Sequence, residues 1–423
     1  MTPSDGASAP ASDHAAASDI DGAYAWRRLL VSLALATIGG IGLWSVVVTL
    51  PAIQAEFGVD RSDASLPYSA TLFGFAIGSV LMGRVVDRFG IARPVMVSGV
   101  ILGLGYITVS TATSLGQFVV VQAVLIGMLG CSVTFGPLVA DISHWFNNRR
   151  GIAIAVVSSG NYLAGTIWPP ILQHGIDTIG WRQAHLGIGI FCLLTILPLA
   201  FFLRRPSPMV DHRQLTGAIV GTTDSLGMSR NTLQTLIIIA GITCCVAMAM
   251  PQVHIVAYCG DLGYGTARGA EMLSIMLGLG IISRLASGVL ADYIGGIGTL
   301  IVGSVLQTIA LMFYLPFDGL VSLYLVSALF GLAQGGIVPS YALIARQYFP
   351  AREAGMRVSL GLTATVVGMA LGGWMSGQIF DLTGSYQAAF LNGIAFNVVN
   401  MSVALWLLKK QFGRRTSSAR PAV

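Results

Sequence analysis

Long apolar stretches alternate with short polar or glycine-rich breaks along most of the chain. A membrane helix needs about 20 mostly apolar residues to cross the hydrocarbon core. Stretches of about this length cover residues 27–50, 65–83, 94–112, 116–140, 151–173, 182–203, 231–258, 268–291, 297–316, 319–345, 357–379 and 387–408. This pattern predicts an all-α integral membrane protein with twelve transmembrane helices.

One long polar segment divides the twelve stretches six and six. The sequence therefore predicts a disordered cytoplasmic tail at 1–22, a six-helix bundle at 23–203, a cytoplasmic linker at 204–230, a second six-helix bundle at 231–410 and a cytoplasmic tail at 411–423. No Lys or Arg precedes Arg27, so the start of the chain lacks the positive region of a secretory signal.

The composition agrees with a membrane protein. Hydrophobic residues make up 54% of the chain and charged residues 10%, whereas a soluble domain is about 25% charged. The 52 glycines also suit membrane helices, which use small residues to approach one another closely. The five cysteines lack the paired spacing of a metal site, and we expect no cofactor.

The basic residues are distributed unequally between the two sides of the predicted bundle. Of the 23 lysines and arginines, 19 lie at the chain ends or in the connections on the same side as those ends. The opposite loops hold Arg61, Arg182 and Arg268, and Arg284 falls inside a span. The positive-inside rule places both termini in the cytoplasm, in an inner or plasma membrane. It also explains the basic charge without nucleic acid.

The two halves of the chain resemble each other at matching connections. The segment GRVVDRFG (83–90) after the second span is echoed by GVLADYIG (288–295) after the eighth, and HWFNNRRG (144–151) is echoed by QYFPAREAG (347–355). Two six-helix repeats with loops matching in order are the organisation of many secondary transporters.

These loops resemble the cytoplasmic signature of the major facilitator superfamily, which implies the major facilitator fold. An Asp at a helix end can pair with an Arg or a helix N-terminus across the boundary between the halves. We therefore expect Asp87, Arg88 and Asp292 to help close the cytoplasmic gate; the alternative is a solvated turn.

Two further segments resemble the monocarboxylate transporter family. DGAYAW (21–26) precedes the first span, and WFNNRRGIAIAVVSSG (145–160) enters the fifth. Both stand where that family has its signatures, although Ala23, Tyr24, Asn148 and Ser159 depart from them. The chain is also similar to the oxalate:formate antiporter group.

Arg284 is the principal candidate for substrate binding. At about 1.5 Å per residue it lies roughly 12 Å into the membrane from Asp292. A charge at such a depth costs at least about 2.5–3.5 kcal/mol, so we expect it to face a polar cavity. A carboxylate suits guanidinium because the two form parallel hydrogen bonds. The alternatives are snorkelling, or a structural tie to Asp141 or Asp292.

The resemblance supports the same residue, because monocarboxylate transporters carry an essential Arg in the eighth span. They also have an Asp one turn earlier, where this chain has Gly280, and animal members have a Lys where this chain has Trp44. Oxalate:formate antiporters use a second cation in the eleventh span, but residues 357–379 contain no Lys. One buried cation favours a monoanion.

Five further residues are candidates for the same cavity. His254 follows Pro251, which predicts a break in the seventh span, and histidine titrates in the physiological range; a structural hydrogen bond is the alternative. Asn161 is a second possible donor to the substrate. Trp44, Tyr162 and Gln334 are cavity candidates, with core packing as the alternative.

Together these observations predict a secondary transporter of a small organic anion. A monocarboxylate with a proton as symport partner is the favoured reading, with alternating access of the two halves to a central site. An antiporter, a carrier of another organic anion, and a substrate sensor on a transporter scaffold remain alternatives. The sequence contains no phosphate-binding loop, metal-binding motif or nucleophile motif of an enzyme.

Overall fold

The computed structural model describes residues 20–205 and 226–418, and every regular element in these ranges is a helix. The first range contains α2 (Ala23–Gly39), α3 (Ile41–Phe57), α4 (Arg61–Phe89), α5 (Ala92–Ser110), α6 (Leu115–Val121), the π-helix η1 (Gln122–Gly130), the 3-10 helix η2 (Cys131–Thr134), α7 (Gly136–Ile142), α8 (Arg150–Ser158) and α9 (Gly160–Phe201). The second contains α10 (Arg230–Asp261), α11 (Thr266–Phe313), α12 (Leu320–Gln334), α13 (Ile337–Tyr348), α14 (Ala351–Thr383) and α15 (Tyr386–Ser418). Most of the predicted N-terminal tail and linker, and residues 419–423, lie outside the described ranges.

Ten helical stretches in the described ranges are long and apolar enough to cross a membrane. Two of them, at 52 and 48 residues, would extend roughly 70–80 Å at about 1.5 Å per residue, more than twice the hydrocarbon core. Each folds back at a glycine with positive φ, Gly180 (φ 81°) in α9 and Gly295 (φ 75°) in α11. A residue with a Cβ rarely adopts this conformation. Each stretch thus supplies two crossings, and the twelve predicted spans are confirmed.

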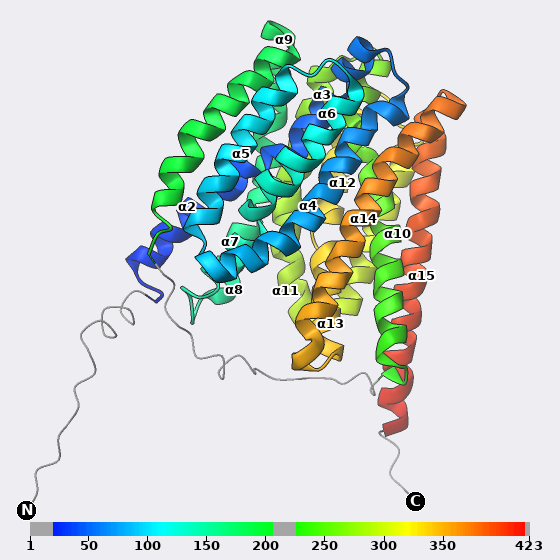
Figure 1. The fold of residues 1–423 in the computed structure, drawn as a ribbon. Coiled ribbons are helices and arrows are strands. Elements are labelled where there is room, and N and C mark those ends of the chain that lie inside the picture. Colours follow the sequence, from blue (N-terminus) through cyan, green and yellow to red (C-terminus); the bar gives the residue numbers. More distant parts are fainter. Residues whose placement is uncertain (1–19, 206–225, 419–423) are drawn as a thin grey trace, which may run out of the picture.

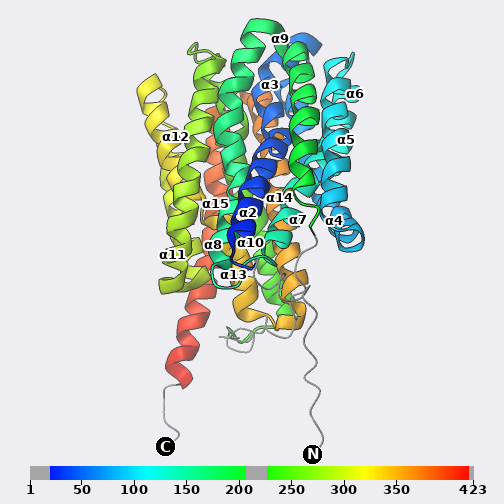
Figure 2. The same ribbon diagram turned by 90° about the vertical axis from the view of Figure 1, so that its left-hand side faces the viewer.

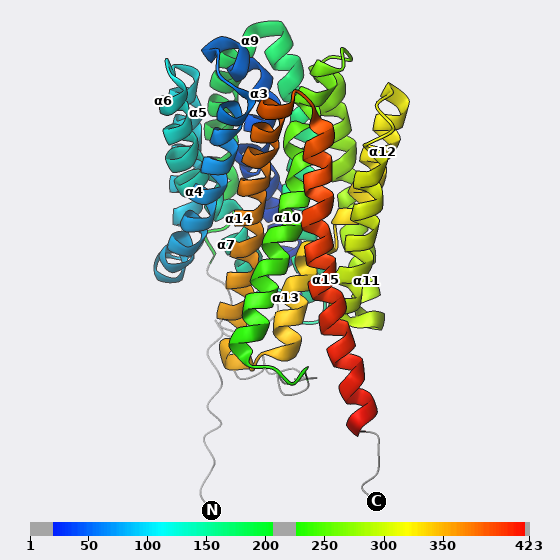
Figure 3. The ribbon, with the colours of Figure 1, turned by 90° about the vertical axis from the view of Figure 1, so that its right-hand side faces the viewer.

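The crossings form two six-helix halves that lie side by side (Figures 1 and 3). The helices of residues 23–201 make one half and those of residues 230–418 the other. The first helix begins and the last helix ends at the same end of the bundle (Figures 1 and 2). We call this end the terminal face and the other end the opposite face.

The repeat predicted from the loops has a geometric counterpart at the terminal face. Helix α4 ends before Gly90 (φ 74°, ψ 170°), and the first limb of α11 ends at Gly295 (φ 75°, ψ 172°). The two glycines close the two echoing segments, so both repeats turn with the same backbone conformation. The other pair of echoing segments connects α7 to α8 and α13 to α14.

Several crossings are interrupted near the middle of the bundle. The interruptions fall at Gly40 between α2 and α3, at η1 and η2 in the fourth crossing, at Ser159 between α8 and α9, and at Gly335 and Gly336 between α12 and α13. The break predicted at Pro251 is wrong, because α10 continues from Arg230 to Asp261 with this proline inside it. Membrane helices tolerate proline where neighbouring helices satisfy the freed backbone groups.

Candidate substrate-binding site

Arg284 extends from the second half of the molecule to the first. It lies in the first limb of α11 and is half-buried. Its Nη1 donates to the carbonyl oxygen of Ser158 at 3.2 Å, and its guanidinium carbon lies 4.4 Å from the centre of the Tyr162 ring. Its Nε is buried and has no hydrogen-bond partner among the described residues. The guanidinium therefore keeps an unused donor at the boundary between the halves.

The alternative of a tie from Arg284 to Asp141 is not found, because both oxygens of Asp141 bind another arginine. Both carboxylate oxygens of Asp141 accept from Arg28, from Nε at 2.8 Å and from Nη2 at 2.9 Å. Both side chains of this pair are buried. Sequence reasoning placed Arg28 among the loop cations and missed the pair, since its members are 113 residues apart.

Gly280 allows Tyr162 to lie beneath Arg284. A Cβ at position 280 would come within 2.5 Å of Cε1 of Tyr162 and 3.7 Å of Nε2 of Gln334. A side chain here would therefore displace the ring on which Arg284 rests. Where monocarboxylate transporters have an Asp one turn before this arginine, Gly280 leaves room for the Tyr162 ring, and this ring contacts Arg284 instead.

Gln334 supplies a second unused donor at the same place. It is the last residue of α12 and is buried, and its Nε2 has no hydrogen-bond partner among the described residues. Its Oε1 accepts from Nε2 of Gln252 in α10, a residue that the sequence analysis missed. Next to it, the amide of Gly335 donates to Oγ of Ser283 at 3.1 Å, which fixes the interruption of the tenth crossing against α11.

Trp44 and Asn161 complete this group on the first half. Nε1 of Trp44 donates to the backbone oxygen of Asn161 at 3.0 Å and to its Oδ1 at 3.2 Å. Asn161 directly precedes Tyr162 in α9, and Trp44 is buried. Five of the six predicted substrate residues thus come from α3, α9, α11 and α12 into one neighbourhood, where two halves of the molecule meet.

The sixth residue, His254, faces a different set of partners. Its Nδ1 lies 3.1 Å from the hydroxyl of Tyr386, and its Nε2 lies 2.7 Å from the carbonyl oxygen of Gly373. The ring is fully buried against α14 and α15. Both nitrogens are engaged within the second half, and neither contacts the group around Arg284.

The opposite face is closed by a cluster that no sequence motif indicated. Arg61 at the start of α4 forms two hydrogen bonds to Asp261 at the end of α10, both 3.0 Å, and one to the hydroxyl of Tyr386 at 2.7 Å. Asp381 of α14 accepts from the backbone amides of Arg61 at 2.9 Å and Ser62 at 2.8 Å. We call Arg61, Asp261, Asp381 and Tyr386 the opposite-face latch.

The latch works partly by capping a helix across the two halves. The first amides of a helix have no partner within it, and Asp60, the residue before α4, makes no side-chain cap. Asp381 takes this role from the other half of the molecule. Deeper in the bundle, Oγ of Ser69 donates to the carbonyl oxygen of Ala370 at 2.6 Å. The halves are therefore joined from this face inward.

The terminal face shows no such junction in residues 20–205 and 226–418. The hydrogen bonds between the halves in these ranges extend from the latch as far as Arg284. Asp87 and Asp292 are exposed, and within the described chain neither makes a hydrogen bond or ion pair. Arg88 lies 5.3 Å from the ring of its neighbour Phe89. The site at Arg284 is thus closed toward the opposite face.

The two segments that resemble monocarboxylate transporter signatures contact each other at the terminal face. The amide of Asp21 donates to the carbonyl oxygen of Trp145 at 3.0 Å, and the Asp21 carboxylate accepts from the amide of Asn148 at 3.0 Å. The rings of Tyr24 and Trp145 are 5.0 Å apart. Segments 21–26 and 145–151 therefore form one structural unit, which neither segment alone could indicate.

Two six-helix halves, with an arginine that keeps an unused hydrogen-bond donor at their boundary and with closure at one face, are the architecture of many membrane transporters. The sequence model of the Major Facilitator Superfamily matches residues 32–326, and the chain belongs to this superfamily. It is 28% identical to monocarboxylate transporter 13 of Rattus norvegicus, over 92% of this chain and 90% of that protein. It is 26% identical to the MFS-type transporter opdF of Penicillium oxalicum, over 82% of this chain and 81% of that protein.

Solved structures show the same fold. A bacterial homologue of the human lysosomal transporter Spinster, in an inward-facing and unoccupied conformation, matches with a TM-score of 0.71 at 14% identity, over 95% of this chain and 99% of the other. The nucleoside transporter NupG matches with a TM-score of 0.72 at 13% identity, over 90% and 99%. With the family model and the curated relatives, the chain is a multi-pass membrane transporter.

Proposed function

We propose that this transporter carries a small monocarboxylate by alternating access, with Arg284 as the residue that binds the carboxylate. The observation that carries the proposal is the pair of buried donors, Nε of Arg284 and Nε2 of Gln334, that have no partner among the described residues. Buried donors are nearly always paired in folded proteins. A carboxylate offers two acceptor oxygens to such a group and matches the charge of Arg284.

The proposal fits the other residues of the site. Gln252 orients Gln334, Trp44 orients Asn161, and the Tyr162 ring supports the guanidinium through a cation–π contact. Arg284 is the one cation that this group presents, so the charge balances a monoanion rather than a dianion. Relatives named monocarboxylate transporter 13 and monocarboxylate transporter 11 support the same substrate class.

We further propose a proton as the symport partner. His254 is hydrogen-bonded to Tyr386, and Tyr386 accepts a hydrogen bond from Arg61 of the latch. A change in the protonation of His254 would therefore act on the contact that closes the opposite face. In this proposal the histidine acts through the latch and the substrate binds at Arg284.

Uptake by the purified protein in liposomes tests the substrate class. We expect radiolabelled lactate or pyruvate to enter faster than malate, succinate or oxalate, because one guanidinium neutralises one carboxylate. An inward-directed proton gradient should raise the initial rate and drive accumulation. Equal transport of the dianions would overturn the monocarboxylate proposal. Uptake that depends on an internal anion and ignores the proton gradient would establish an antiporter.

We also propose that the terminal face is cytoplasmic, in an inner or plasma membrane, because 19 of the 23 basic residues lie on this side. A reporter enzyme that is active only outside the cytoplasm, fused at residue 415, is expected to give no signal. The same reporter inserted at Gly263, in the connection between α10 and α11, serves as the positive control. Activity at residue 415 would reverse the orientation.

A further inference from the structure

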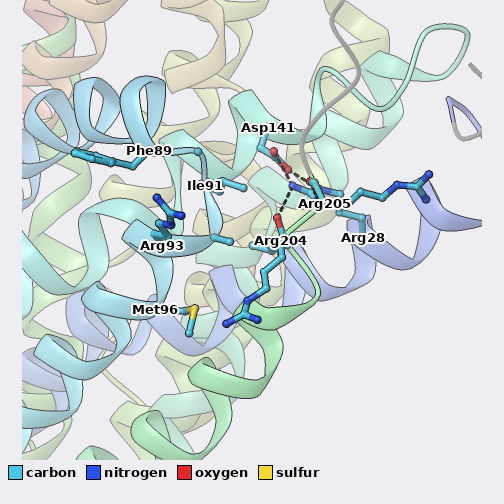
Figure 4. A pocket seen from close by; sticks show the side chains of 11 residues that line it. Arg28, Phe89, Ile91, Arg93, Met96, Asp141, Arg204 and Arg205 are labelled. Atoms are coloured by element: carbon cyan, nitrogen blue, oxygen red, sulfur yellow. Dashed lines mark hydrogen bonds and ion pairs between the residues drawn. The ribbon is translucent and has the colours of Figure 1, made fainter. Parts of the chain in front are cut away.

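A basic cavity lies at the terminal face, away from the candidate substrate site. Its volume is about 710 Å³, and it lies between the start of α2, the start of α5, the end of α7 and the end of α9 (Figure 4). Four arginines line it, together with one carboxylate. The residues that matter for its chemistry are Arg28, Arg93, Asp141, Arg204, Arg205 and Phe89.

The charges that line this cavity do not cancel. Asp141 is occupied by the bidentate bond to Arg28, so this buried pair is neutral as a unit. Arg93 and Arg204 are exposed, and within the described ranges neither has a carboxylate partner. They lie on the side of the cavity away from the Arg28–Asp141 pair (Figure 4). The cavity therefore keeps an excess of positive charge where a ligand has access.

The wall that carries Arg204 is held in place by Arg28. Nη2 of Arg28 donates to the carbonyl oxygen of Leu203 at 3.2 Å, and Nη1 donates to that of Arg205 at 3.1 Å. These bonds tie the chain on both sides of Arg204 to α2. The guanidinium of Arg204 lies 3.8 Å from the centre of the Phe201 ring. The backbone that carries this cation is thus held by Arg28, and its guanidinium rests against Phe201.

The start of α5 adds to the positive potential. This helix begins at Ala92 beside the cavity, and it has neither a side-chain cap nor an acidic residue in its first turn. The free amides at a helix start carry partial positive charge and bind anions. Ala92 and Arg93 of this first turn line the cavity.

One exposed phenylalanine lines the cavity, and two more are close in sequence to Arg204. Phe89 lines it and is 49% exposed, and Phe201 and Phe202, which precede Arg204 with Leu203 between, are 47% and 63% exposed. Large apolar side chains at this exposure suit contact with lipid. An occupant that matches both features has an anionic head and an apolar tail.

We propose that this cavity binds the phosphate headgroup of an anionic phospholipid, with the phosphate between Arg93 and Arg204 and the acyl chains along the exposed phenylalanines. Basic pockets at the cytoplasmic ends of membrane helices bind such headgroups. A soluble organic phosphate shares the same chemistry at the head but gains nothing from the phenylalanines. The lipid would join α5 to the end of α9 and so stabilise the terminal end of the first half.

Native mass spectrometry of the purified full chain with phosphatidylglycerol tests this proposal. Each arginine near a membrane surface contributes about 1 kcal/mol, or roughly fivefold. The double variant Arg93→Ala/Arg204→Ala is therefore expected to bind phosphatidylglycerol roughly 30-fold more weakly. Phosphatidylcholine, which has no net charge, should bind weakly to both proteins. The variant Arg93→Lys/Arg204→Lys keeps both charges and should retain most of the binding.

A matched control removes the same charge from the same face. Arg27 and Arg346 are exposed and do not line the cavity, so Arg27→Ala/Arg346→Ala should leave phosphatidylglycerol binding within about twofold. Equal losses in the control and the test variant would overturn the proposal, because binding would then follow surface charge alone. Glycerol 3-phosphate binding as tight as the lipid, and lost in the same double variant, would assign the cavity to a soluble phosphate instead.

Discussion

Replacing Arg284 with lysine is expected to remove most transport while the protein still folds and inserts. Lysine keeps the positive charge but lacks the planar fork of guanidinium, and its ammonium is more strongly hydrated. It also loses the Nε that has no partner among the described residues. One lost charge-assisted hydrogen bond costs about 1.5–3 kcal/mol, roughly a tenfold to hundredfold loss of substrate affinity.

The glutamine variant separates charge from geometry. Arg284→Gln is expected to bind substrate more weakly than Arg284→Lys, because the buried attraction for the anion disappears with the charge. Arg268→Gln is the matched control: it removes an arginine from the same helix at an exposed ion pair with Glu271, and transport should remain. Substrate affinity is measured in proteoliposomes, with expression and gel-filtration profiles as the check on folding. Near-normal affinity in the lysine variant would remove Arg284 from the site, because lysine snorkels as well as arginine.

The twelve crossings could be predicted because the signal for a membrane span is local. Every apolar stretch from 27–50 to 387–408 overlaps one or more of the helices that the structure shows, and the boundaries differ by a few residues. Arg284 could be singled out for the same reason, since a charge inside an apolar stretch costs free energy of insertion wherever its partner lies. Trp44, Asn161, Tyr162 and Gln334 were separate candidates, as polar or aromatic residues inside predicted spans, and the structure places them near Arg284.

The pairings between distant helices could not be predicted. Arg61 and Asp261 are 200 residues apart, and each looks like an ordinary loop charge in the sequence. Arg28 likewise looked like one of many positive-inside arginines, although it is 2% exposed and bound to Asp141. Which charges meet depends on how the two repeats pack. The same limit explains the wrong prediction of a helix break at Pro251. Whether α10 continues through this proline depends on the helices packed around it, and the local sequence does not show them.

Breaking the opposite-face latch is expected to shift the transporter toward conformations that open at this face. Arg61→Ala removes both hydrogen bonds to Asp261 and the one to Tyr386. Conformational couplings of this kind amount to about 1–3 kcal/mol, or roughly a fivefold to 150-fold shift in the equilibrium. Arg182→Ala is the matched control, because its ion pair with Glu56 joins α9 to α3 within the first half.

Cysteine labelling measures this shift directly. The five native cysteines are buried, so Ser69→Cys provides a reporter at the buried contact between Ser69 and Ala370. We expect a membrane-impermeant maleimide to label this cysteine about 5- to 150-fold faster in the Arg61→Ala background. The Arg182→Ala background should label as slowly as the parent. Equally slow labelling in both backgrounds would show that the apolar contacts of α4 with α14 hold the face closed without the ion pair.

The same reporter tests the proposed role of Asp87 at the other end of the molecule. If Asp87 helps to close the terminal face when the opposite face opens, Asp87→Asn destabilises that opened state and returns the equilibrium toward the conformation described here. Added to Arg61→Ala, it should therefore slow the labelling of Ser69→Cys again, by a similar factor. This opposition follows because alternating access couples the two faces: a contact that closes one of them stabilises the state in which the other is open. Labelling that stays fast in the double variant would leave Asp87 as a solvated residue of the turn and assign the closing of the terminal face to other contacts.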